Sequence, residues 1–192
     1  MTYSKEYKIG LEMIAKSNFS VKSVKTFMGR EGCGVNANIY YKNKKIGHII
    51  DSGNGGCLDI SYYNNKNEWT RKNNEVDKFL HTLPKYTYKW DDTSESVVSQ
   101  FDDEDFWNAL VDDYMVLKNF KKTMKKIHLF HDNKVFTFTK ANKPSLLDKK
   151  YHHNGVNGIS FRDILKDEYK GCIILNDIST SKAFDIFKKY AN

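Results

Sequence analysis

Residues 29–63 read GREGCGVNANIYYKNKKIGHIIDSGNGGCLDISYY, and this stretch decides the fold. Seven of the eleven glycines of the chain lie between positions 29 and 56, and none lies between Gly56 and Gly155. Because glycine permits tight reversals and positive φ, this clustering predicts short strands joined by turns. The runs between the turns are rich in β-branched and aromatic residues. They predict a four-stranded antiparallel β-meander within residues 20–63, with strands at Val21–Phe27, Asn38–Lys42, Lys45–Ile50 and Leu58–Tyr63.

The remainder, residues 64–192, mixes helical and strand patterns. Its strongest signal is a long amphipathic helix at about 102–126, with an acidic first turn and a lysine-rich last turn. Residues 91–100 are predicted to be a polar loop and residues 141–160 a mobile loop. The other elements expected are a helix at Glu68–Leu83, a strand at Tyr86–Trp90, a second β-hairpin around Asp132-Asn133, a strand at Gly171–Leu175 and a C-terminal helix. With 192 residues and no linker, we expect one α+β domain, residues 1–192, in which the meander packs with the long helix.

Composition narrows the class of protein further. The chain is 40% apolar and 14% aromatic, which is enough surface to bury in a folded core. No run of 18 apolar residues occurs and the N-terminus lacks the pattern of an export signal, so we expect a cytoplasmic protein without membrane contact. The three cysteines are then expected to be reduced. The net charge of +7 weakly favours an anionic partner.

The two glycine-rich turns are the strongest candidate for a binding site. If residues 29–35 and 52–57 meet at one end of the sheet, charged and amide side chains line a shared rim on a rigid scaffold. Their backbone N–H groups are candidates to receive an anion, although turn formation alone also explains the glycines. The Gly-x-Gly-x-x-Ala match at Gly32–Ala37 precedes a predicted strand, not a helix, which argues against a dinucleotide site. The candidate partner-binding residues are Arg30, Glu31, Asn36, Asp51 and Asn54.

Aromatic residues and lysines offer a second kind of site. The predicted strand at Tyr86–Trp90 places three aromatic residues on one face, and five lysines lie within residues 118–126. The alternative is that the aromatic rings face the core and the lysines stabilise a helix end. Arginine, which base-reading sites favour, occurs only three times. The candidates for stacking on a nucleotide or nucleic acid are Tyr40, Tyr62, Tyr86, Tyr88 and Trp90.

Patterns for catalysis and metal binding are weak. His128 and His131 lie on a predicted strand at a spacing that places them on opposite faces, and no Cys/His spacing matches a structural zinc site. Cys33 and Cys57 are conceivable thiolates with His48 as a base, but no motif supports this arrangement. We therefore expect no enzyme activity, no metal and no cofactor.

The segments Val24–Tyr40, Lys44–Ile46 and Ile50–Asp59 carry the patterns G-x-E-G-x-G-x-N-A and D-x-G-N-G-G-C. In them the chain resembles small uncharacterised proteins of tailed bacteriophages and prophages. The likeness covers about residues 20–63, with a fainter echo at Ile173–Asn176. It implies a phage gene expressed inside a bacterium.

In that setting we expect a non-enzymatic binding protein that blocks a host component. The first candidate for this target is an antiviral defence protein. The rim is the first candidate surface of the chain, and the acidic residues 102–113, as a mimic of phosphate charges, are the second. Two alternatives stay open: a sponge that sequesters a nucleotide signal, and a DNA- or RNA-binding accessory protein. Whether the chain forms a homo-oligomer also stays open.

Overall fold

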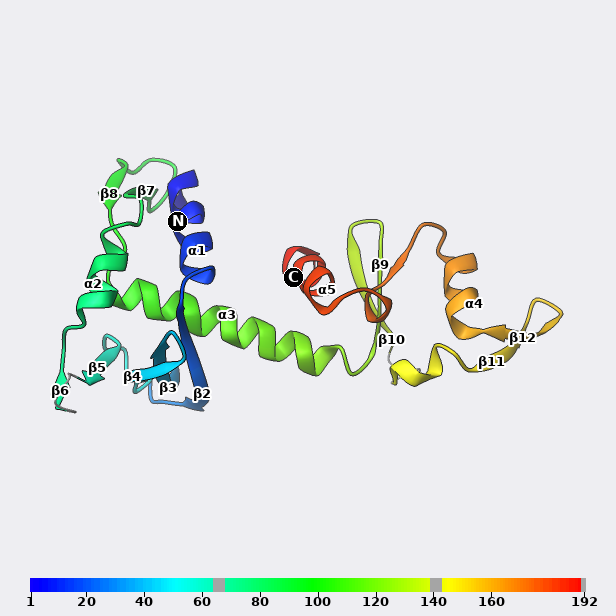
Figure 1. Cartoon of the computed structure of the whole chain (residues 1–192). Coiled ribbons are helices and arrows are strands. Elements are labelled where there is room, and N and C mark those ends of the chain that lie inside the picture. The colour runs from blue at the N-terminus through cyan, green and yellow to red at the C-terminus, as the bar shows by residue number, and fades with distance from the viewer. Residues whose placement is uncertain (64–67, 139–142, 191–192) are drawn as a thin grey trace. The chain divides into compact units, whose positions relative to one another are not determined.

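The computed structural model describes residues 1–63, 68–138 and 143–190 (Figure 1). The chain divides into two compact units, Met1–Met115 and Val116–Asn192. Each unit combines helices with small antiparallel sheets, so the α+β class predicted from the sequence is confirmed.

A five-stranded antiparallel meander dominates the first unit. Its strands follow the chain in the order β2 (Phe19–Met28), β3 (Cys33–Tyr41), β4 (Lys44–Asp51), β5 (Asp59–Tyr63) and β6 (Trp69–Thr70). The predicted meander is confirmed, with two differences. β3 begins at Cys33, five residues earlier than predicted, so Gly34 lies inside a strand. β6 is formed by residues that helical spacing had assigned to a helix.

Three helices and a second sheet complete this unit. The helices are α1 (Lys5–Ala15), α2 (Asn74–Leu80) and α3 (Asp103–Thr123), and the sheet joins β1 (Thr2–Tyr3), β7 (Tyr86–Lys89) and β8 (Val97–Ser99). The strand predicted at Tyr86–Trp90 is confirmed as β7, but the loop predicted over residues 91–100 is wrong at its end, where β8 pairs with β7. The long predicted helix is confirmed as α3, which ends in the second unit. The helix predicted over Glu68–Leu83 is shorter, because the Asn73 side chain accepts hydrogen bonds from the N–H groups of Glu75 and Val76 and so starts α2.

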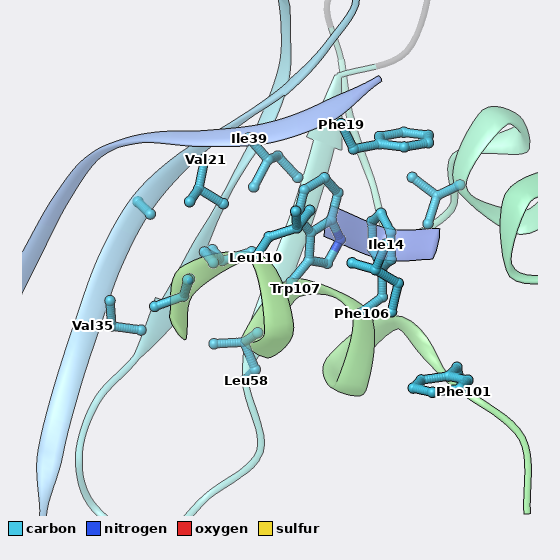
Figure 2. Close-up of a cluster of buried hydrophobic side chains, with 14 of the residues drawn as sticks. Ile14, Phe19, Val21, Val35, Ile39, Leu58, Phe101, Phe106, Trp107 and Leu110 are labelled. Atoms are coloured by element: carbon cyan, nitrogen blue, oxygen red, sulfur yellow. The ribbon is translucent and has the colours of Figure 1, made fainter. Parts of the chain in front are cut away.

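The core of the first unit lies between the helices and the inner face of the meander. Strand residues alternate between two faces, so Val35, Ala37 and Ile39 all point inward from β3. Figure 2 shows the side chains of α3 that meet them, including Trp107 and Leu110. Trp107 has no exposed surface, and burial of such a large side chain stabilises the sheet–helix contact.

An irregularity in β2 sets which of its side chains face outward. Two residues, Ser23 and Val24, stand where β3 supplies only one, between the pairs Lys22–Asn38 and Lys25–Asn36. Ser23 takes a positive φ of 56°, and this β-bulge leaves Val24 buried. Both lysines therefore point to the outer face of the sheet.

The second unit is built from shorter elements. A hairpin of β9 (Ile127–His131) and β10 (Lys134–Phe138) pairs with β13 (Ile173–Ile174), which confirms the predicted second hairpin and places the late strand at its side. The C-terminal helix is confirmed as α5 (Thr180–Tyr190). The other elements of the unit are 3₁₀ turns at Pro144–Leu146 and Leu175–Asp177, the hairpin β11 (Lys150–His153) and β12 (Val156–Ser160), and α4 (Phe161–Glu168).

The prediction of a loop over residues 141–160 is wrong for its described part. Asn154 and Gly155 both take positive φ, as a tight hairpin turn requires, and they join β11 to β12. Residues 141 and 142 lie outside the described residues. Among the helices of the described ranges, none has the length and apolar character needed to cross a membrane.

Candidate functional site

The two glycine-rich loops meet at one end of the meander, as the sequence suggested. The Glu31 N–H donates to the Gly53 carbonyl oxygen at 2.8 Å, and the Arg30 N–H donates to Asn54 Oδ1 at 3.1 Å. Within the first loop, the Gly29 N–H donates to the Gly32 carbonyl oxygen at 2.7 Å. The loops therefore brace each other, and we call their exposed edge the rim.

Two of the glycines are required by this close approach. A Cβ on Gly29 would lie 2.5 Å from the carbonyl oxygens of Ser52 and Gly53, which are backbone atoms that cannot swing away. Gly53 has a φ of 68°, and a Cβ there would lie 2.8 Å from the Gly32 carbonyl oxygen. Gly32 itself has open space around the position of a Cβ. Packing of one backbone on another thus explains Gly29 and Gly53 without a ligand.

The bracing also uses the donors that an anion would need. The N–H groups of Arg30 and Glu31 bond to the opposite loop, and the Gly53 N–H donates to Asp51 Oδ1 at 2.8 Å. An anion nest works by presenting several unpaired N–H groups to one ligand. The rim therefore gives little support to phosphate binding by its backbone.

The five predicted rim residues differ in exposure and in position. Arg30, Glu31 and Asn54 are exposed. Asp51 is half-buried, and its carboxylate accepts the hydrogen bond from the Gly53 N–H within the second loop. Asn36 is exposed but lies within β3, paired with Lys25 and Ile50, and not in either loop.

Sequence reasoning missed two apolar residues beside the rim. Phe27 is 43% exposed and Met28 is 83% exposed, and both lie at the end of β2 that leads into Gly29. Phe27 ends the predicted strand Val21–Phe27 and Met28 follows it, so the sequence pattern gave neither residue a role beyond the strand and its turn. Aromatic residues, methionine and arginine are enriched at protein interfaces, so Phe27, Met28 and Arg30 together resemble the centre of a contact surface.

Two of the predicted stacking residues belong to the core. Tyr62 has no exposed surface: its hydroxyl accepts from Trp107 Nε1 at 2.7 Å and donates to Asp103 Oδ2 at 3.0 Å. Burial raises the pKa of Tyr62, so the hydroxyl stays protonated and keeps donating. Tyr86 is only 6% exposed. Neither ring is available to a base.

The other three stacking candidates, Tyr40, Tyr88 and Trp90, are partly or largely exposed to solvent. Tyr88 and Trp90 have ring centroids 5.7 Å apart in an edge-to-face arrangement, and Trp90 is 62% exposed. Tyr40 is half-buried on the outer face of the meander.

The acidic start of α3 serves the fold. Asp103 accepts from the Tyr62 hydroxyl, Glu104 Oε1 accepts from the Leu58 N–H at 3.2 Å, and Asp105 accepts from the Tyr86 hydroxyl at 3.4 Å. Asp103 Oδ1 is buried without a hydrogen-bond partner, and burial raises the pKa of both Asp103 and Asp105. These carboxylates join the helix to the strands, so they do not form the free acidic surface expected of a phosphate mimic.

The outer face of the meander carries a group of lysines and aromatic rings. Lys22 Nζ lies 4.5 Å from the centroid of the Tyr40 ring, and Lys45 Nζ lies 5.7 Å from that of Tyr63. The Trp69 ring lies 4.0 Å from the ring of Tyr63 and meets the ring of His48 edge-on at 4.6 Å. We call this surface the outer face; it includes Lys22, Lys25, Tyr40, Lys45, His48, Tyr63 and Trp69.

The second unit contains a cavity of about 430 Å³ lined largely by apolar side chains, among them Phe138, Tyr151 and Phe161. Its two histidines already have neighbours: His152 Nδ1 lies 2.6 Å from Asn157 Oδ1, and His153 Nε2 lies 3.8 Å from Glu168. Within the described part of the chain, no group of His, Cys, Asp or Glu is arranged to hold a metal ion.

No family model, curated protein or solved structure matches this chain.

Proposed function

We propose that this chain is a non-enzymatic binding protein that blocks a component of a bacterial host, above all an antiviral defence protein. The rim, extended by Phe27 and Met28, is its contact surface. The observation that carries the proposal is the combination of a braced backbone with exposed charged and apolar side chains. The bacterial setting follows from the resemblance to phage proteins.

A braced loop is an efficient binding surface for a physical reason. Association loses conformational freedom in each segment that becomes ordered, and preorganisation reduces this loss. The rim backbone is already fixed by the Glu31–Gly53 and Arg30–Asn54 hydrogen bonds. Met28 then supplies apolar area, and Arg30 and Glu31 supply charges that select a complementary partner.

The nucleotide-sponge alternative has weaker support at this site. Its phosphate donors would have been the loop N–H groups, at least four of which bond within the protein, and one of its stacking residues, Tyr62, is buried.

A capture experiment tests the proposal. Tagged protein is incubated with nuclease-treated bacterial lysate, and retained proteins are identified by mass spectrometry. We expect a specific host protein to bind the unmodified chain, and the Arg30→Ala/Glu31→Ala and Met28→Ala variants to lose it with little change in melting temperature.

The matched control is Lys85→Ala/Glu95→Ala, which removes one charge of each sign from exposed positions outside the rim. This variant should retain the partner. Equal retention by the rim variants and the control would refute the rim as the contact surface.

A further inference from the structure

We propose that the outer face of the meander binds single-stranded nucleic acid, with bases stacked on Trp69 and Tyr63 and with Lys22, Lys25 and Lys45 against the phosphates. This site is separate from the rim and does not depend on the proposed blocking function.

The side chains of the outer face are accessible. Residues that point inward from β3 are buried, whereas Asn36, Asn38 and Tyr40, which alternate with them, are exposed or half-buried. The register carries this face across the sheet, because Lys22 pairs with Asn38, Asn38 with His48, and His48 with Ser61. Trp69, at the opposite edge from Lys22, is 53% exposed.

Aromatic rings and cations alternate on this face. Lys22 lies over Tyr40, Lys45 lies over Tyr63, and Trp69 stands beside Tyr63. Single-stranded nucleic acid presents the matching alternation of flat bases and phosphates, and base–aromatic stacking tolerates any sequence because every base has a π-face. Lys45 lies opposite Tyr40, between that ring and the rings of Tyr63 and Trp69, and the amide group of Asn38 lies in the next row of outward residues, opposite His48, where it can bond to base edges or sugars.

The charge of the outer face favours a polyanion. Lys22, Lys25 and Lys45 are exposed, and the one acidic side chain among its described outward positions, Asp59, lies 3.8 Å from Arg71. A protein partner would need acidic side chains to neutralise these lysines and apolar side chains to cover the aromatic rings. In a single-stranded nucleic acid the phosphates neutralise the lysines and the bases cover the aromatic rings.

The shape of the outer face favours single strands over duplex. Readout of a duplex requires a helix or ribbon that enters a groove, and this face is the broad side of a sheet. The bases of a duplex are also stacked on one another and cannot lie on Trp69 and Tyr63.

Fluorescence anisotropy with a labelled oligothymidylate of about 12 nucleotides tests the proposal, since such a length lies within known site sizes. Oligouridylate and a duplex of equal length are the comparison probes. If three lysines contact phosphates, the affinity should fall about 20-fold between about 50 and about 200 mM salt, from a log–log slope of about −2. Trp fluorescence should be quenched on binding.

Two variants identify the surface. Trp69→Ala should weaken binding at least about fivefold, because one stacked base is lost, and it should remove part of the quenching. Lys22→Ala/Lys45→Ala should reduce the salt slope to about one third, because one of three phosphate contacts remains. Circular dichroism checks that both variants are folded.

Three further variants serve as controls and should bind like the unmodified chain. Lys5→Ala/Lys8→Ala removes two exposed lysines from α1, Arg30→Ala/Glu31→Ala alters the rim, and Lys121→Ala/Lys122→Ala alters the basic end of α3.

Several results would overturn the proposal. These are an absence of binding to either single-stranded probe at about 50 mM salt, equal affinity for duplex, or loss of binding in the α3 variant with retention in Trp69→Ala. The proposal also fails if nucleic acid does not bind, while a purified host protein binds the unmodified chain and does not bind Trp69→Ala. The outer face would then be a protein interface.

Discussion

The two units of this chain distribute their buried residues differently. Met1–Met115 has one continuous core, in which the inner face of the meander meets three helices. Val116–Asn192 has two small clusters, one around Leu129 and one around Phe120. The broad sheet of the first unit has one face covered by helices, which leaves its other face and its loops free for binding. The binding surfaces proposed above accordingly both lie in the first unit.

The largest effect is expected from Trp107→Ala. This substitution removes the largest fully buried side chain and the donor to the Tyr62 hydroxyl, and it should lower the free energy of unfolding of the first unit by about 3–5 kcal/mol. Urea denaturation followed by circular dichroism measures the change. Trp107→Phe retains most of the volume and should cost less; equal losses in both variants would contradict the packing argument.

The counterpart in the second unit is Leu129→Ala, which should lower its free energy of unfolding by about 2–5 kcal/mol. All three tryptophans lie in the first unit, at positions 69, 90 and 107. The circular dichroism transition should therefore broaden or split while the Trp fluorescence transition stays in place. A fluorescence transition that moves by the same amount would show that the two units unfold as one.

A smaller effect is expected at the rim, from Gly29→Ala. The new Cβ would press on the Ser52 and Gly53 carbonyl oxygens and should lower stability by about 1–3 kcal/mol. The matched control is Gly32→Ala in the same turn, where the space is open and the change should stay within about 0.5 kcal/mol. The difference in urea midpoint between the two variants measures the bracing; no difference would mean that the loops separate easily.

The smallest effect is a pH dependence that differs between the units. His128 is fully buried between the Thr123 carbonyl oxygen and the Thr137 hydroxyl, and burial lowers its pKa below the ordinary value of 6.5. As the pH falls, the unfolded chain therefore binds a proton at this histidine before the folded chain does. The stability that depends on neutral, buried His128 is complete above about pH 6.5, and it decreases at lower pH by at most about 1.4 kcal/mol per pH unit.

Circular dichroism melts at about pH 7.5 and about pH 5.5 test this dependence, on either side of the ordinary histidine pKa. Burial raises the pKa of the Asp103 carboxyl above its ordinary value of 3.8. The folded first unit therefore binds this proton before the unfolded chain does, and its free energy of unfolding increases as the pH falls toward 3.8. His128→Leu should remove the acid sensitivity of the second unit; an unchanged sensitivity would assign it to another group.

Strong periodic patterns made much of the first unit predictable. The glycine cluster marked the turns, and alternate turns of a meander lie at the same end of the sheet, so the meeting of the two loops followed from the order of elements. The three- to four-residue spacing of apolar residues located α3. These features are local in sequence, which is why reasoning from residues succeeded.

Features that depend on tertiary contacts were missed. The alternation of Tyr62 and Tyr63 shows that one ring faces inward, but a shift of one residue exchanges the two faces, and only the packing on Trp107 decides between them. No element was assigned to Lys5–Ala15, where Gly10 allows the Phe101 ring to approach α1. The division into two units left no linker to detect, because its boundary falls within α3.

The bulge in β2 has a consequence for the behaviour of concentrated samples. β2 stands at one edge of the five-stranded sheet, and a flat edge strand invites another chain to pair with it and extend the sheet into a fibril. The positive φ of Ser23 and the flanking charges of Lys22 and Lys25 interrupt that template. Pairing of a second chain with β2, which would extend the sheet from one molecule to the next, is therefore disfavoured at this edge.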